Sequence, residues 1–174
     1  QDVVTQNEGA VVVITGEKGG AAPVQSSGCF VHASGLILTT AHQVRGVAHL
    51  KAKRANGEVY DCKAISIDEG REVALLQAGV TDAPTVRIGD AKTLRGGSPL
   101  VAIATPENLD FSAVSGIVSS TNRTYQGHPV IQADLPAGPG SSGGPVFDGS
   151  GALVGVVIGK LRDQDRVTVV NPVN

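Results

Sequence analysis

The chain has 174 residues, including 23 Gly, 9 Pro, two Cys and no Met or Trp, and its 14 basic and 16 acidic side chains give a net charge of −2. This length suits one compact domain or two small lobes that share an interface. Nucleic acids and anionic membranes attract clustered Lys and Arg, and without such a cluster neither is expected as a partner. The apolar runs fall far below the ~18–20 residues of a membrane helix, so no membrane span is expected.

Short apolar runs separated by turn residues indicate an all-β fold. Six strand-like runs occupy the first half of the chain, at residues 11–14, 28–31, 36–38, 49–53, 59–68 and 73–76. Six more follow in the second half, at residues 100–104, 110–120, 130–133, 144–147, 153–158 and 167–170. The pair Asn56-Gly57 predicts a type I′ hairpin turn, since both central residues of that turn adopt positive φ.

Two sets of six strands predict two packed six-stranded antiparallel β-barrels, because closing each sheet into a barrel removes its exposed edges. We assign residues 1–82 to the N-terminal barrel and residues 83–174 to the C-terminal barrel, the two together forming one domain. The cleft between two such lobes is a usual place for a functional site.

The most specific motif in the sequence is Gly140-Ser141-Ser142-Gly143-Gly144-Pro145. At this chain's composition, the pattern G-x-S-G-G-P arises by chance about once in a thousand such sequences. A nucleophilic serine needs an exposed hydroxyl beside backbone N–H groups that converge on the oxygen that becomes negative during acyl transfer. We therefore predict Ser142 as a nucleophile, with an oxyanion hole formed by the backbone of residues Gly140, Ser141 and Ser142. A Gly-rich turn without chemistry is the alternative.

A serine hydroxyl needs a base to take its proton, and His42 is the strongest candidate among four histidines. It ends the segment Thr39-Thr40-Ala41-His42, just after an apolar strand, where a side chain can face a cleft. We expect His32, His49 and His128 at the surface. No His or Cys pair has the close spacing of a metal motif, so no metal is expected.

The order of His42, an acidic residue and Ser142 along the chain, with the motifs T-A-H and G-x-S-G-G-P, resembles the chymotrypsin-like serine peptidases. The protease domain of the HtrA/Deg family is the more similar group, through segments 27–31, 35–44, 73–76, 88–90, 101–104, 114–119 and 131–134. The resemblance implies the two-barrel trypsin fold, peptide-bond hydrolysis through an acyl-enzyme, and no cofactor. The last residues, 167–174, resemble the strand before the family's PDZ domain, and no PDZ segment follows it in this sequence.

The third member of the triad departs from the family pattern, which has an aspartate where this chain has Glu72. A glutamate can orient the histidine and stabilise its imidazolium. Its extra methylene, however, moves the carboxylate by ~1.5 Å, and a misplacement of that size can cost about 100-fold in rate. Either the site has adapted or catalysis is weak. The alternative for Glu72 is a surface carboxylate paired with Arg71 or Lys63.

The resemblance also places the pocket for the substrate side chain. Its base lies six residues before the nucleophile, at Pro136 beside Ala137, and its opposite wall comes from Val157, Ile158 and Gly159. This base holds no carboxylate for a Lys or Arg side chain, so we expect small or medium aliphatic residues before the scissile bond. The backbone of the wall is expected to pair with an extended substrate.

Cys29 and Cys62 lie on two strands of the first predicted barrel, and the sequence leaves their state open. A disulfide between them would stabilise the fold by roughly 3–4 kcal/mol in the chain-entropy model. Free cysteines are also common in protein cores. Neither cysteine lies where a nucleophile is expected.

Two functions fit these observations. The first is a serine endopeptidase that cleaves unfolded or flexible polypeptides, with Ser142 attacking, His42 shuttling the proton and Glu72 orienting the imidazole. The second is a catalytically impaired trypsin-fold protein that binds peptides. Glu72 is the only residue that suggests this second function. A chain without Met is expected to be processed or excised, which fits a periplasmic or secreted location. We expect a monomer, because residues 1–9 lack the aromatic side chains typical of the family's trimers.

Overall fold

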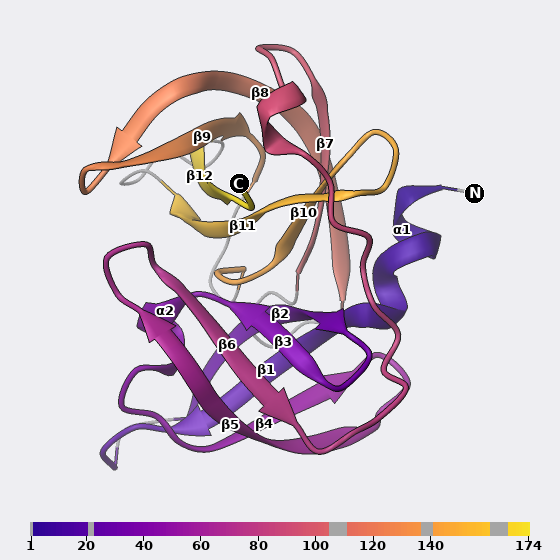
Figure 1. Cartoon of the computed structure of the whole chain (residues 1–174), viewed down its shortest axis with the longest axis vertical. Helices are drawn as coiled ribbons and strands as arrows, with labels where there is room; N and C mark the ends of the chain where they lie inside the picture. The colour runs from indigo at the N-terminus through magenta and orange to yellow at the C-terminus, as the bar shows by residue number, and fades with distance from the viewer. Residues whose placement is uncertain (1, 21–22, 105–110, 137–140, 161–166) are drawn as a thin grey trace.

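The computed structural model describes residues 2–20, 23–104, 111–136, 141–160 and 167–174, and it shows two β-barrels stacked on each other (Figure 1). The first barrel is closed in the order β1-β2-β3-β6-β5-β4. Its strands are β1 (Val11–Glu17), β2 (Val24–His32), β3 (Leu36–Thr39), β4 (Ala48–Arg54), β5 (Val59–Asp68) and β6 (Val73–Ala78).

The second barrel is closed in the order β10-β11-β12-β9-β8-β7. Its strands are β7 (Pro99–Ala104), β8 (Ser112–Tyr125), β9 (His128–Asp134), β10 (Pro145–Asp148), β11 (Leu153–Lys160) and β12 (Val167–Pro172). Neighbouring strands within both barrels are antiparallel. The predicted all-β fold of two six-stranded antiparallel barrels is therefore confirmed.

The link between the barrels packs against both of them. The N–H of Val86 donates to the Phe30 carbonyl at 3.1 Å, and the N–H of Gly89 donates to the Leu153 carbonyl at 2.8 Å. A short 3₁₀ turn, η2 (Ala91–Thr93), follows before β7. Because the link has contacts on both sides, the domain boundary at residues 82 and 83 stays a prediction.

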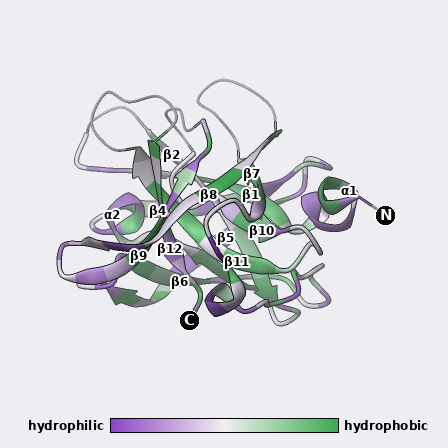
Figure 2. Ribbon diagram, turned by 90° about the horizontal axis from the view of Figure 1, so that it is seen from above, coloured by the Kyte–Doolittle hydropathy of each residue, from purple (hydrophilic) through white to green (hydrophobic). Residues whose placement is uncertain are grey.

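Apolar side chains fill both barrels and join them into one unit. Seen from above, hydrophobic residues lie along the strands and many hydrophilic ones lie at the connections (Figure 2). Ile103, Phe147 and Leu153 of the second half belong to the same buried cluster as the core of the first barrel. Burial of such side chains is the main favourable contribution to folding. The interface between the barrels is thus a continuation of the core, which fixes the two halves of any site built across it.

A short helix precedes the first barrel and contacts the second barrel. Helix α1 (Val3–Asn7) begins at Asp2, whose side chain accepts the Thr5 N–H at 2.9 Å, and η1 (Glu8–Ala10) follows it. The Asn7 amide donates to the Gly151 carbonyl at 3.0 Å, so the N-terminus is tied to the second barrel (Figure 1). A helix of five residues is too short to give an apolar period, so the sequence pattern does not predict it.

The turn at Asn56-Gly57 is not of the predicted type I′. Gly57 has a φ of +92°, but Asn56 is not among the described residues with positive φ. The Asn56 side chain instead accepts the Glu58 N–H at 2.9 Å, and the Gly57 N–H donates to the Arg54 carbonyl at 2.9 Å. The loop is one residue longer than the two-residue loop of a type I′ hairpin, so only its glycine adopts the left-handed conformation.

Candidate active site

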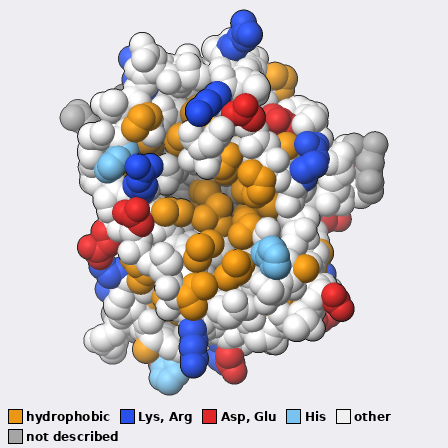
Figure 3. Space-filling view, viewed as in Figure 1, with side chains coloured by type: hydrophobic (Ala, Val, Ile, Leu, Met, Phe, Trp, Pro, Cys, Tyr) orange, Lys and Arg blue, Asp and Glu red, His pale blue; other side chains and the backbone are white. Residues whose placement is uncertain are grey.

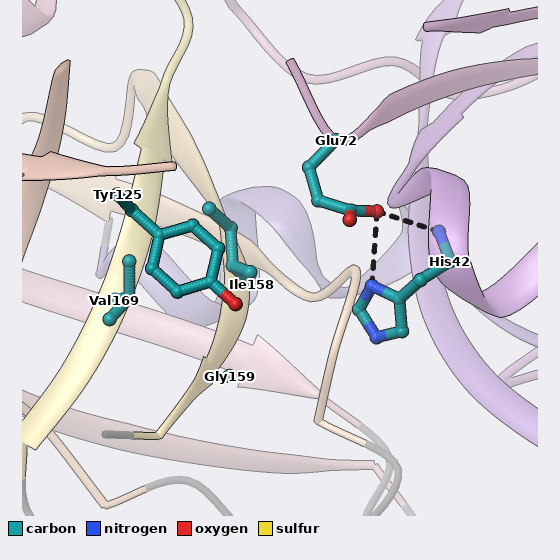
Figure 4. Close-up of a pocket in the computed structure, with 6 residues that line it drawn as sticks. All are labelled: His42, Glu72, Tyr125, Ile158, Gly159 and Val169. Atoms are coloured by element: carbon teal, nitrogen blue, oxygen red, sulfur yellow. Dashed lines mark hydrogen bonds and ion pairs between the residues drawn. The ribbon is translucent and has the colours of Figure 1, made fainter. Parts of the chain in front are cut away.

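His42 lies in α2 (Ala41–Val44), a single helical turn that follows strand β3. The preceding residues Thr39 and Thr40 are fully buried, and the Thr39 hydroxyl donates to the Ser27 carbonyl at 2.8 Å. These contacts fix the start of α2 in the core of the first barrel. The imidazole of His42 is one-third exposed, at 33%, and faces the second barrel (Figure 4).

Glu72 ends the turn between β5 and β6 and contacts His42 (Figure 4). Its Oε1 atom accepts the backbone N–H of His42 at 2.7 Å and lies 3.1 Å from the ring atom Nδ1. An ionised carboxylate is only an acceptor, so the proton of a neutral His42 is on Nδ1 and the lone pair is on Nε2. The structure therefore pairs Glu72 with His42, and not with Arg71 or Lys63.

The backbone of Glu72 adopts the left-handed conformation, with a φ of +59°. For a residue other than Gly this conformation costs about 1–2 kcal/mol, and Asp and Asn tolerate it better than Glu. Asp68 lies in the same turn but does not contact His42. The Oδ1 atom of Asp68 accepts the Arg71 N–H at 3.1 Å, which stabilises the turn.

Ser142 lies in the loop before β10, which is packed against the first barrel. Its carbonyl accepts the Ser27 N–H of β2 at 2.9 Å. The next residue, Gly143, has a φ of +86°, and a Cβ atom there would lie 2.0 Å from the Ser27 carbonyl oxygen. No side chain fits in that space, and an L-residue rarely adopts this φ. Glycine at this motif position is thus required by the packing of the loop between the barrels.

The Ser142 hydroxyl and the His42 ring each have another partner in this structure. Ser142 Oγ donates to the Ile158 carbonyl at 3.0 Å, and the Gln43 amide nitrogen lies 3.0 Å from His42 Nε2. The lone pair of Nε2 accepts this amide N–H. Hydrogen bonds between catalytic groups are commonly loose without substrate and tighten in the reacting complex. A proton transfer from Ser142 to His42 therefore requires rotation of the serine side chain and departure of the Gln43 amide.

The predicted oxyanion hole is partly described. Within the described part of the chain, the N–H of Ser142 has no hydrogen-bond acceptor. Ser141 is buried, and its carbonyl accepts the Gly144 N–H at 3.0 Å. Gly140 lies outside the described residues.

A pocket of about 250 Å³ opens beside the His42–Glu72 pair. Besides these two, its lining residues come from the second barrel and are Tyr125, Ile158, Gly159 and Val169 (Figure 4). Sequence reasoning missed Tyr125 and Val169. The pairing of Gly159 with Val169 and of Tyr125 with His128 brings them here, and no local motif marks such pairings.

The other residues of the predicted substrate pocket have different surroundings. Pro136 is exposed, and Ala137 lies outside the described residues. Val157 is buried; its N–H donates to the Gly144 carbonyl at 2.9 Å and its carbonyl accepts the Gly143 N–H at 2.8 Å. The N–H and the carbonyl of Val157 are therefore both engaged by the loop before β10.

The remaining candidates lie apart from His42. His32 contacts Ser34, and His49 lies 3.6 Å from Glu17. Across the described ranges, no group of three His, Cys, Asp or Glu side chains could hold a metal ion. None of the described helices has the length and apolar character to cross a membrane.

Cys29 and Cys62 are both free thiols, so the disulfide that the sequence allows is not formed. Burial raises the pKa of the Cys29 thiol to about 12 and that of the Cys62 thiol to about 11. Both thiols are therefore protonated near neutral pH, and neither is an activated nucleophile.

This chain is similar in sequence to a known family of peptidases. The family model described as trypsin-like peptidase domain matches residues 26–156. A protein of Halomonas elongata named probable periplasmic serine endoprotease DegP-like is 35% identical over 133 residues, which are 75% of this chain and 28% of that protein. A Pseudomonas fluorescens protein of the same name has the same identity and coverage. The chain thus spans about a quarter of the length of these curated relatives.

Solved structures share the whole fold. The HtrA-type protease AlgW with tripeptide superposes with a TM-score of 0.92 at 23% identity, covering 98% of this chain and 58% of that chain. AlgW with decapeptide gives a TM-score of 0.89 at 20% identity, with 99% and 63% covered. At this identity the likeness establishes the arrangement of the two barrels, and the chemistry has to be argued from the residues.

Proposed function

The chain belongs to the trypsin-like peptidase domain family, and from this premise we propose that it is a serine endopeptidase of the HtrA/Deg type with Ser142, His42 and Glu72 as its triad. One observation carries the proposal: a single oxygen of Glu72 accepts both the backbone N–H and the Nδ1–H of His42. That contact holds the imidazole with its basic Nε2 turned away from the carboxylate, as a general base requires.

The reaction would proceed through an acyl-enzyme. Ser142 Oγ attacks the scissile carbonyl carbon while His42 Nε2 takes the hydroxyl proton, and the carbonyl oxygen becomes an oxyanion. The N–H groups of Ser142 and Gly140 stabilise that oxyanion. His42 then gives its proton to the leaving amine as the C–N bond breaks. A water molecule, deprotonated by His42, hydrolyses the acyl-enzyme and restores Ser142.

Glu72 supports both proton transfers without changing its own protonation. Its negative charge faces the imidazolium that forms when His42 is protonated, and its two hydrogen bonds fix the ring. The alternative function, peptide binding without cleavage, is suggested by this glutamate alone. Glu72 lies within hydrogen-bond distance of His42, which argues against impairment by a misplaced carboxylate.

The substrates would be extended or unfolded polypeptides with an aliphatic side chain before the scissile bond. The pocket predicted for this side chain has Pro136 and Ala137 at its base and Val157, Ile158 and Gly159 as its wall, with no carboxylate among them. The pocket beside His42 adds Val169 and Tyr125, and its one carboxylate, Glu72, is engaged with His42. A Lys or Arg side chain would find no free counter-charge among these lining residues. Small and medium apolar side chains fit the volume of about 250 Å³.

The name of the DegP-like relatives places those proteins in the periplasm. We infer an extracytoplasmic site of action for this chain as well, in the periplasm or after secretion. We propose that the domain is a monomer that acts on polypeptide substrates without a cofactor.

Covalent labelling with serine-directed phosphonates tests the function. A simple fluorophosphonate should label the native protein at Ser142, identified by mass spectrometry of the peptide, and not the variant Ser142→Ala. Ser34→Ala, in a surface turn where Ser34 contacts His32, is the matched control and should label normally. Among peptidyl phosphonates, Val or Leu next to phosphorus should react at least about tenfold faster than Lys or Asp.

Two outcomes would contradict the proposal. If the native protein were not labelled but Glu72→Asp were, the native chain would be a binding module with a disabled triad. If the Lys phosphonate reacted fastest, the proposed aliphatic pocket would be wrong even though the protein is an active peptidase.

A further inference from the structure

Asn171 of β12 donates its side-chain amide to the carbonyl of Arg71 at 2.6 Å. These residues are 100 positions apart and belong to different barrels. The accepting carbonyl belongs to the peptide bond that precedes Glu72, the residue that contacts His42. An amide of the second barrel thus holds the backbone next to the triad acid of the first barrel.

The contact acts on the conformation of Glu72 directly. A peptide group is planar, so holding the Arg71 carbonyl also holds the nitrogen of Glu72 and restricts rotation about its φ angle. That angle is +59°, in the left-handed region that a glutamate disfavours. The N–H of Arg71, which belongs to the preceding Gly70–Arg71 peptide group, donates to Asp68 Oδ1 of the same turn at 3.1 Å.

The surroundings of Asn171 favour a stable bond. Asn171 and Arg71 line a groove of about 670 Å³ between the barrels, and most of the other lining side chains are apolar. Figure 3 shows this face of the molecule, with hydrophobic side chains gathered in a central hollow between the barrels. Asn171 is partly buried and lies opposite Val156 in the β11–β12 ladder, which fixes the direction of its side chain. The bond itself is exposed to solvent, so the fixed place of Asn171 in the ladder, and not exclusion of water, favours this contact.

We propose that Asn171 is a positioning residue of the active site: its amide holds Glu72 in the left-handed conformation, from which the longer glutamate side chain places its carboxylate on His42. This inference rests on the proposed function and assigns the second barrel a role in orienting the triad acid. It also explains how a glutamate reaches His42 at 3.1 Å although it is one methylene longer than the family's aspartate.

Two variants with matched controls test this role. Asn171→Asp keeps the shape of the side chain but replaces the donor amide with a carboxylate that repels the Arg71 carbonyl. Asn174→Ala removes another amide of the C-terminal segment, one that contacts Ala91 and Asp90 within the second half. We expect N171D to lower kcat by about tenfold with KM unchanged, since small misplacements of catalytic groups have effects of this order. N174A should leave kcat and KM unchanged.

The Glu72→Asp background separates positioning from general stability. Aspartate tolerates the left-handed conformation better than glutamate, so N171D should lower kcat less than threefold when combined with E72D. An equal loss in both backgrounds, or an equal loss for N171D and N174A, would overturn the positioning role.

A spectroscopic readout keeps this test independent of peptidase activity. The Nδ1–H proton of His42, hydrogen-bonded to Glu72, should give a low-field proton NMR signal in the native protein that is lost or shifted upfield in N171D and retained in N174A. If native protein lacks activity but N171D still removes the signal, the positioning role stands and the proposed function fails. An unchanged signal in N171D overturns the positioning role whatever the activity.

Discussion

At the residue scale, the site depends on which atoms are protonated. The carboxylate of Glu72 fixes the His42 tautomer through two hydrogen bonds, while Gln43 contacts His42 and the Ile158 carbonyl accepts the Ser142 hydroxyl. These last two contacts are single hydrogen bonds, each of the order of 1 kcal/mol net. A substrate that fills the pocket can therefore displace them with little loss of binding free energy.

The two cysteines provide a residue-scale prediction. Because burial raises the pKa of Cys29 to about 12 and that of Cys62 to about 11, only a small fraction of either thiol is ionised at pH 8. Iodoacetamide at pH 8 should leave Cys29 unmodified in the native protein and modify Cys62 slowly, whereas both should react at once in urea. Intact mass under non-reducing conditions would contradict the free-thiol state if it showed the loss of two hydrogens.

The sequence was informative about individual residues only where a motif surrounds them. Ser142 and His42 were predicted from G-x-S-G-G-P and T-A-H, and Glu72 from its place in the family pattern. Gln43, Tyr125 and Asn171 carry no such mark, because a polar residue after a histidine or an asparagine near a strand end is ordinary. Their importance comes from contacts between segments distant in sequence, which only the register of the strands establishes.

At the element scale, side chains in the turns stabilise the strands that carry the site. The turn between β10 and β11 is held by Asp148, whose Oδ1 accepts from the Ser150 N–H at 2.8 Å, the Ser150 hydroxyl at 2.6 Å and the Ala152 N–H at 3.1 Å. Partial burial alone would raise the pKa of Asp148, but these hydrogen bonds outweigh it and the net pKa lies below its ordinary value.

The sign of the resulting pH dependence follows from the lowered pKa. Asp148 contributes its full stability above the ordinary pKa of 3.8, and this contribution is lost as the pH falls through the lower folded-state value. We expect Asp148→Ala to reduce the free energy of unfolding by about 1–2 kcal/mol at pH 7, and the difference from the native chain to shrink below pH 4. Urea unfolding at both pH values measures it.

A surface carboxylate provides the control for this prediction. Asp61 is 87% exposed and pairs with Lys51 at 2.6 Å on the outside of the first barrel. Asp61→Asn should leave the urea midpoint unchanged, because exposed ion pairs contribute little. A loss of stability for D148A that persisted undiminished at pH 3 would show that packing, and not the charge of Asp148, stabilises the turn.

Element positions were predictable because apolar runs and glycines alternate regularly along this chain. The type of an individual turn was harder to predict. The pair Asn56-Gly57 predicts type I′, but the Asn56 side chain accepts a backbone N–H and the loop contains a third residue. Helix α1 was also missed, since its five residues are stabilised by an Asp2 cap and by a contact to the second barrel. Such tertiary contacts leave no periodic pattern in the sequence.

At the scale of the whole molecule, each barrel supplies an incomplete site. His42 and Glu72 come from the first barrel, Ser142 and the pocket walls come from the second, and the Ser27–Ser142 and Asn171–Arg71 hydrogen bonds cross between them. The shared apolar cluster holds the barrels in fixed relation. Counting strands predicted the two barrels, but the contacts that align them involve single backbone groups and could not be predicted from the sequence.

The proposed triad of Glu72, His42 and Ser142 is tested most directly by the kcat/KM of Glu72→Gln. The amide lacks the negative charge and can donate to Nδ1, which favours the tautomer that cannot accept the Ser142 proton. With a peptide carrying an aliphatic residue before the scissile bond, E72Q should lose about 10³–10⁴-fold in kcat/KM. Glu69→Gln, in the same turn and paired with Arg45, should lose nothing. A loss of less than about tenfold for E72Q would show that Glu72 is not a member of the triad.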